Sequence, residues 1–322
     1  MNRRVGLVVM LLVAAVTTAR VSRAASVDDG GAGASAPARS DSTNPGGGRV
    51  VLSGKAEDGD RYFFNLLTRR SRYGTGFFPE HFRQTSLDRE HELRLDYFQG
   101  GHTGRHEQEI EGEIEWAIKD LTLTVEAEWE SEHEIDEETG GWKRDEGWQT
   151  VKFKAHHPLY QYVSADDSFD YTLVGKVSVG VPLSGSLRHD SYEIYPLLGQ
   201  LLRLGGHFTT QTWTGVNFVT GGDERGTREL RYGALFGWNL SRTEVAIPGV
   251  QALTPLLELD GQSSLSGEEH VHRLFGVAGA RFDLTPIGPL QPRFGLGYLF
   301  PIDTGARREL SWGVQSSLIF EF

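Results

Sequence analysis

Residues 310–322, which read LSWGVQSSLIFEF, carry the plainest structural signal in the chain. Every second position is apolar apart from one serine: Leu310, Trp312, Val314, Ser316, Leu318, Phe320 and Phe322. The positions between them are mostly small or polar. Because alternate side chains of a β-strand point to opposite faces, this pattern predicts a strand with one apolar face.

The amino-terminal region has the layout of an exported protein. Residues 1–4 are basic, residues 5–16 are apolar, and Ser22 and Ala24 are small residues that suit cleavage before Ala25. We predict a signal peptide over residues 1–24 and a disordered periplasmic tail over residues 25–48, which are rich in Gly, Ala, Ser and Pro. The chain has no cysteine, which excludes a lipoprotein anchor and disulfides.

The composition beyond residue 24 excludes a membrane-spanning helix and argues against nucleic acid as a partner. The mean hydropathy is −0.36, and the longest later stretch without a charge, residues 204–222, is rich in threonine. The formal net charge is −12, and it becomes −16 without the four arginines of the predicted signal peptide. Such an acidic chain would be repelled by a polyanion.

From residue 90 onward, alternation of apolar and polar residues recurs at regular intervals. We predict about twelve strands, at 91–99, 106–118, 121–132, 148–156, 169–181, 191–203, 207–219, 229–241, 253–260, 271–284, 292–300 and 309–322. Without a long apolar helix, a chain spans a membrane only as a closed barrel. The predicted fold is an all-β, closed antiparallel transmembrane β-barrel over residues 90–322, although ten or fourteen strands also fit the sequence.

The predicted connections alternate in length, as they do in outer-membrane barrels. If the amino end is periplasmic, residues 119–120 and 204–206 are tight periplasmic turns. The longer, charged connections 133–147, 220–228 and 261–270 are then extracellular. Two periplasmic connections, 157–168 and 242–252, are longer than this rule favours.

The hairpin predicted at residues 106–132 has one acidic face. Its glutamates recur at every second position: Glu107, Glu109, Glu111, Glu113, Glu115, Glu126, Glu128 and Glu130. In a barrel they would line the lumen, whereas in a soluble sheet they would face water. Paired like charges repel, so we expect basic partners on other strands, among them Lys152, Lys154, Arg231 and Arg293. Either the acidic face favours cations, or the interior is self-neutralising; the sequence leaves both open.

Residues 49–89 are aromatic and basic, without a regular period. Such a segment could lie in the barrel mouth as a plug, or it could add a strand near residues 61–67. The sequence does not choose between these two possibilities.

Catalytic and metal-binding patterns are weak, so we predict no enzyme activity, no metal site and no cofactor. The chain has no Gly-x-Ser-x-Gly motif, and His189, Asp190 and Ser191 are immediate neighbours, which rarely converge as a triad. Glu268, His270 and His272 could share a metal, but the sequence supplies no further ligand.

The last strand, which ends with Phe320 and Phe322, resembles the assembly signal of bacterial outer-membrane β-barrels. Most of residues 61–322, including YFFNLL at 62–67, resembles the outer-membrane transporter barrels grouped under the phenol-degradation meta-pathway label. This resemblance implies the outer membrane of a Gram-negative cell, contact with its lipid, and insertion by the barrel assembly machinery. It also implies uptake of aromatic or other small solutes.

The predicted function is therefore a porin-like outer-membrane channel or transporter for small solutes, with an acidic wall that favours cations. Two alternatives stay open. One is a surface-binding or structural barrel that acts through residues 133–147 and 220–228. The other is an outer-membrane hydrolase.

Overall fold

The computed structural model describes residues 60–63, 78–83, 87, 91–118, 120–136, 140–164, 168–183, 191–221, 226–266 and 271–322. The chain divides into two compact units, Met1–Asp41 and Ser42–Phe322. The predicted signal peptide and periplasmic tail lie outside the described residues, and everything below concerns the second unit.

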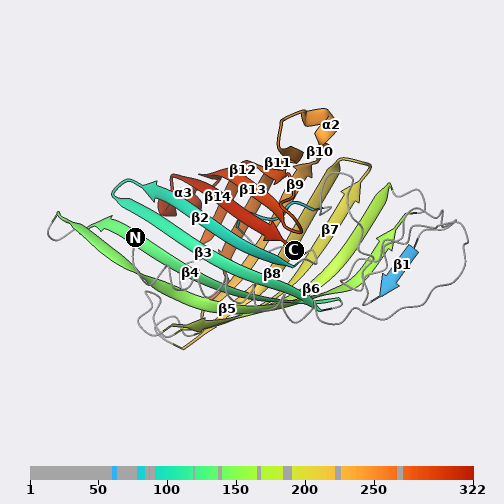
Figure 1. The fold of residues 1–322 in the computed structure, drawn as a ribbon. Helices are drawn as coiled ribbons and strands as arrows, with labels where there is room; N and C mark the ends of the chain where they lie inside the picture. The colour runs from blue at the N-terminus through green and yellow to red at the C-terminus, as the bar shows by residue number, and fades with distance from the viewer. Residues whose placement is uncertain are drawn as a thin grey trace, which may run out of the picture. The chain divides into compact units, whose positions relative to one another are not determined.

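Twelve long antiparallel strands form one closed barrel, as predicted (Figure 1). The sheet closes because β5 pairs with both β4 and β6, while β14 pairs with β2. The barrel strands are β2 (Glu92–His102), β3 (Arg105–Ile118), β4 (Leu121–Ile135), β5 (Trp142–Val163), β6 (Phe169–Pro182), β7 (Tyr192–Leu204), β8 (Phe208–Thr220), β9 (Arg228–Trp238), β11 (Val250–Ser264), β12 (His272–Leu284), β13 (Gln291–Pro301) and β14 (Trp312–Glu321).

Four short elements accompany the barrel in the part of the chain that the structure describes. Strand β1 (Asp60–Phe63) pairs with the end of β5, and β10 (Leu240–Ser241) pairs with β11. Helix α2 (Arg242–Val245) lies in the connection predicted at residues 242–252, and α3 (Thr304–Glu309) joins β13 to β14. No helix in the described part of the chain has both the length and the apolar character to cross a membrane.

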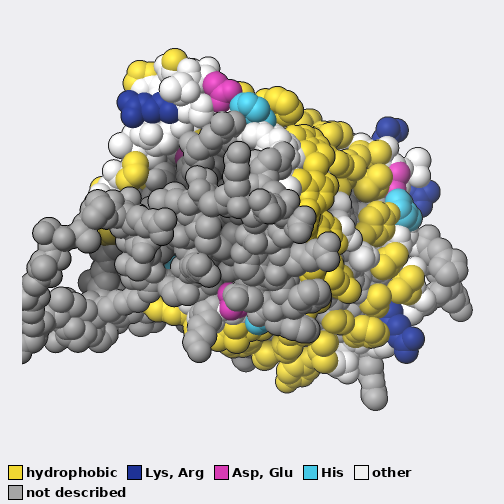
Figure 2. All heavy atoms as spheres, turned by 90° about the vertical axis from the view of Figure 1, so that its right-hand side faces the viewer, with side chains coloured by type: hydrophobic (Ala, Val, Ile, Leu, Met, Phe, Trp, Pro, Cys, Tyr) yellow, Lys and Arg dark blue, Asp and Glu magenta, His cyan; other side chains and the backbone are white. Residues whose placement is uncertain are grey.

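The side chains alternate between an apolar outer face and a largely polar inner face. On β14, Val314 and Leu318 are exposed, whereas Gln315 and Ser317 are buried. The same holds on β13, where Leu296 and Tyr298 are exposed. Figure 2 shows hydrophobic side chains over much of the described surface, with charged side chains toward its margins. Outward apolar residues match lipid, and the closed ladder leaves no unpaired strand edge in the membrane.

The structure corrects three predicted boundaries. Strand β5 spans residues 142–163 rather than 148–156, so the connection predicted at 157–168 contains only residues 164–168. The strand continues past Pro158 because a register shift between Pro158 and Tyr160 accommodates the proline. The loop predicted at 133–147 shrinks to a turn at 136–141, because β4 and β5 extend their pairing. Strand β14 begins at Trp312 because residues 304–309 form α3, and Leu310 is buried.

Candidate functional site

The inner face of β3 and β4 carries the glutamates that the sequence singled out, and we call this set the acidic wall: Glu107, Glu109, Glu111, Glu113, Glu115, Glu126, Glu128 and Glu130. The register places Glu113 opposite Glu126 and Glu109 opposite Glu130. Four members, Glu113, Glu115, Glu126 and Glu130, are buried, and the others are half-buried. Their chain neighbours Trp116 and Val125 are exposed, which sets the acidic wall on the inside of the barrel.

Two lysines of β5 neutralise part of the acidic wall. Lys152 Nζ lies 2.8 Å from Glu126 and 3.2 Å from Glu128. Lys154 Nζ lies 3.1 Å from Glu113 and also contacts Glu126. The antiparallel register explains these contacts, because Lys152 is directly opposite Glu126. Buried carboxylates need such partners, since an unpaired buried charge is strongly destabilising.

Carboxylates crowd further along this wall. Glu92, Glu113 and Glu115 offer oxygen atoms within 4.8 Å of one another, and Glu111, Glu113 and Glu126 form a second such group. Because Lys154 contacts Glu113 and Glu126, a lysine supplies countercharge at both groups.

Residues 78–83, which we call the internal segment, pass through the barrel interior. Phe78 and Phe82 are buried in an apolar cluster with inward side chains of several strands, among them Leu201, Leu235 and Leu299. His81 packs edge-on against Trp213 of β8, with ring centroids 4.4 Å apart. Apolar contact therefore fixes the aromatic side chains of the internal segment against the barrel.

Barrel side chains also bind the main chain of the internal segment. The Glu258 carboxylate accepts hydrogen bonds from the amides of Phe82, at 2.7 Å, and Arg83, at 3.1 Å. Arg94 and Arg281 each donate to the His81 carbonyl at 2.7 Å. Arg281 also donates to the Glu80 carbonyl at 3.1 Å, and two glutamines contribute as well: Gln211 donates to the Pro79 carbonyl and Gln315 donates to the Phe82 carbonyl. A buried main chain requires such partners, and the barrel supplies them from five strands.

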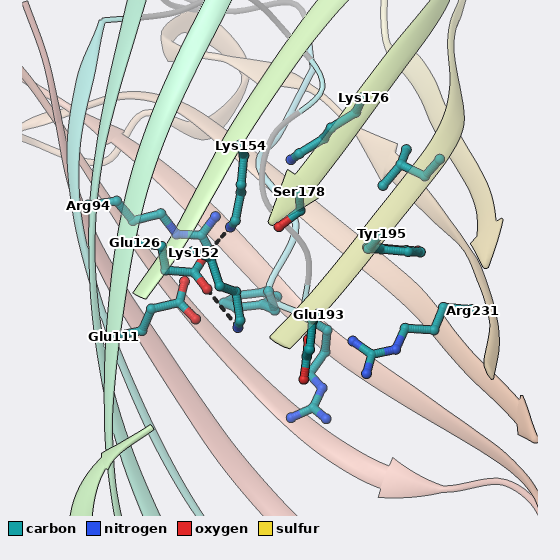
Figure 3. A pocket seen from close by; sticks show the side chains of 13 residues that line it. Arg94, Glu111, Glu126, Lys152, Lys154, Lys176, Ser178, Glu193, Tyr195 and Arg231 are labelled. Carbon is teal, nitrogen blue, oxygen red and sulfur yellow. Dashed lines mark hydrogen bonds and ion pairs between the residues drawn. The ribbon is translucent and has the colours of Figure 1, made fainter. Parts of the chain in front are cut away.

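A cavity of about 110 Å³ lies between the acidic wall, the internal segment and strands β6, β7 and β9 (Figure 3). Six cationic side chains line it, namely Arg83, Arg94, Lys152, Lys154, Lys176 and Arg231. Three carboxylates line it as well: Glu111, Glu126 and Glu193. Phe82, Ser178, Tyr195 and Leu197 complete the lining. The cavity is thus richer in basic groups than the acidic wall beside it.

The four predicted basic partners fall into two groups. Lys152 and Lys154 meet the acidic wall, as described above. Arg231 lies on β9, lines the cavity and pairs with Glu229 at 3.0 Å. Arg293 lies on β13, where it contacts Glu80 of the internal segment and Glu321. Both arginines pair with carboxylates outside the acidic wall. Arg231 pairs with a residue of its own strand, and Arg293 pairs with residues of the internal segment and of β14.

Sequence reasoning missed Glu258 and Gln315 as binding groups, because single polar residues on a strand carry no motif. At the carboxyl end, Phe322 stacks with His91, with ring centroids 6.2 Å apart. Ser191 donates to the Gly221 carbonyl at 3.3 Å, and its neighbours His189 and Asp190 lie outside the described residues.

His272, which the sequence offered as a metal ligand, has other partners. Its Nδ1 lies 2.6 Å from Asp303, and its Nε2 lies 2.6 Å from the Tyr232 hydroxyl. Glu268 and His270, the other two residues of that set, lie outside the described residues.

Comparisons with known proteins agree with the fold. No protein-family model matches the sequence, and no curated protein is similar to it. Among solved structures, an outer-membrane channel from Pseudomonas putida F1 matches with TM-score 0.50 and 11% identity, over 77% of this chain and 100% of that chain. The NanC porin matches with TM-score 0.44 and 9% identity, over 72% and 98% of the two chains. The protein therefore has the closed-barrel fold of bacterial outer-membrane proteins, which fits a location in the cell outer membrane.

Proposed function

We propose that this protein is an outer-membrane channel for small solutes, which pass through the barrel lumen. The observation that carries the proposal is a closed barrel with apolar residues outside and charged residues around an internal cavity. The internal segment narrows this path, because the buried side chains of Phe78 and Phe82 occupy the interior. Passage then depends on the space between the internal segment and the acidic wall.

We also propose that the acidic wall gives the lumen a preference for cations. Its eight glutamates exceed the two lysines that contact it from β5. Glu107 and Glu109 lie toward the end of the barrel that carries the turn at 136–141, which faces outward in the predicted orientation. Carboxylates at a pore entrance raise the local concentration of cations.

The remaining parts of this proposal concern partners and solutes. Phe320 and Phe322 end the last strand and would present it to the barrel assembly machinery, while the apolar outer face contacts lipid. The phenol-degradation resemblance suggests aromatic or other small molecules as solutes.

Single-channel conductance in a planar bilayer, under a salt gradient, tests the function. We expect steady current with a reversal potential that indicates cation preference. The triple variant Glu107→Gln, Glu109→Gln, Glu128→Gln should lower that preference, whereas Glu134→Gln with Glu146→Gln, on the exposed hairpin, should leave it unchanged. A folded barrel that never conducts would overturn the channel, and unchanged selectivity in the triple variant would overturn the cation preference alone.

A further inference from the structure

The cavity presents two hydrogen-bond donors that have no acceptor among the described residues. One is the hydroxyl of Tyr195 on β7, a side chain that is 7% exposed. The other is Nε of Arg231 on β9, a buried atom although the residue itself is only half-buried. Buried polar groups in folded proteins are almost always satisfied, so two unsatisfied donors at one cavity indicate a missing acceptor.

The two side chains that carry these donors are neighbours. The Arg231 guanidinium carbon is 5.7 Å from the centre of the Tyr195 ring. In Figure 3 they lie on one side of the cavity, and Glu111, Lys152 and Lys154 lie on the other. One small group with several acceptor oxygens could therefore meet both donors.

Most of the basic side chains around the cavity are paired with carboxylates: Arg83 with Asp260, Arg94 with Asp96, Lys152 and Lys154 with the acidic wall, and Arg231 with Glu229. The cavity lining holds six basic side chains and three carboxylates. Of these carboxylates, Glu126 is already engaged by both Lys152 and Lys154. A carboxylate suits the two free donors best, because charge-assisted hydrogen bonds are the strongest that they can form.

The rest of the lining is apolar where the internal segment meets β7. Phe82 and Leu197 are both buried and both line the cavity. Together with the Tyr195 ring they form a compact apolar surface beside the donors. A ligand that fits this cavity thus has an acceptor group at one end and a small apolar body at the other.

We propose that this cavity binds a small organic anion, a carboxylate with an aromatic or other compact apolar body. Its oxygen atoms accept hydrogen bonds from the Tyr195 hydroxyl and Arg231 Nε, and its body packs on Phe82 and Leu197. This inference rests on the proposed channel function, but not on its proposed cation preference, and names a class of solute for the channel. The acidic wall slows the entry of an anion without occupying these donors, so higher salt should speed binding.

Titration calorimetry of the purified full-length protein tests the ligand class. Benzoate is the probe, and benzyl alcohol and benzylammonium have the same ring without the negative charge. We expect benzoate to bind with one-to-one stoichiometry and the other two to bind at least about tenfold more weakly. Equal affinity for benzoate and benzyl alcohol would overturn the proposal.

Two variants test the assigned donors. Tyr195→Phe removes only the hydroxyl, and Arg231→Lys keeps the charge but removes the Nε donor. Each should weaken benzoate binding about tenfold. Tyr298→Phe, on the exposed outer face, is the matched control and should bind like the parent protein. The heat-dependent gel migration of folded barrels confirms that each variant is folded.

The two proposals fail separately. Unchanged benzoate affinity in both donor variants would overturn this site, even if the barrel conducts. Benzoate binding that needs both donors, in a barrel that never conducts, would support the site and overturn the channel.

Discussion

The two sides of the barrel interior hold their buried polar groups in different ways. On the acidic wall, charged side chains meet partners from neighbouring strands: Lys154 contacts Glu126, which is 28 residues away, and Glu113, which is 41 residues away. Around the internal segment, Glu258 binds an amide 176 residues away and Arg281 binds a carbonyl 200 residues away. The contacts of the acidic wall follow from the register of the neighbouring strands. The contacts of the internal segment form only when the barrel closes around this segment, which precedes the barrel in the chain.

We expect the largest loss of stability when a lysine partner of the acidic wall is removed. Lys154→Met removes the lysine partner of Glu113 and leaves Glu126 with Lys152 alone, which should lower the free energy of unfolding by about 3–5 kcal/mol. Urea unfolding in lipid vesicles measures this change. Lys143→Met removes an ion pair on the exposed hairpin and should have no measurable effect. Equal stability of the two variants would show that the buried pairs of the acidic wall contribute little.

We expect a smaller energetic effect when Glu258, which binds the internal segment, is replaced. Glu258→Gln leaves one of the Phe82 and Arg83 amides facing an NH₂ group, at a cost of about 1–3 kcal/mol. The docked state is then less populated, so conductance and trypsin cleavage after Arg83 should both increase. Glu146→Gln, on the exposed hairpin, is the matched control. Unchanged conductance with unchanged cleavage would mean that Glu258 is not needed to hold the segment.

We expect the smallest effect at Asp303, which lies between β13 and α3 and belongs to neither side of the interior. Burial opposes ionisation of Asp303, but hydrogen bonds from the Ala306 amide and His272 hold its pKa below the usual value. Because ionised Asp303 caps α3, protection of the Ala306 amide from hydrogen exchange should persist at mildly acidic pH. It should be lost only as the pH falls through this lowered pKa.

The substitution Asp303→Asn should weaken that protection at neutral pH without changing conductance. Exchange that does not depend on pH in the parent protein would rule out Asp303 as the capping group.

Much of the barrel could be predicted from the alternation of apolar and polar residues. A strand between lipid and a hydrated lumen needs apolar side chains on one face and polar side chains on the other. The boundary errors arose where local rules conflict with pairing. The predicted strand at 148–156 stopped before Pro158, yet the pairing of β5 with β6 continues past this proline with a register shift. Leu310 matched the alternating pattern of the last strand but is instead the buried C-cap residue of α3.

By itself, the sequence determined the strand content, the apolar outer face and the acidic hairpin, because each of these depends on residues that are near in the chain. Only the tertiary structure decided where residues 78–83 lie, and that Arg293 pairs with Glu80 of this segment. It also decided that a basic cavity adjoins an acidic wall. Those features depend on side chains from opposite sides of a closed barrel, and a pattern along one strand contains no information about what faces it across the lumen.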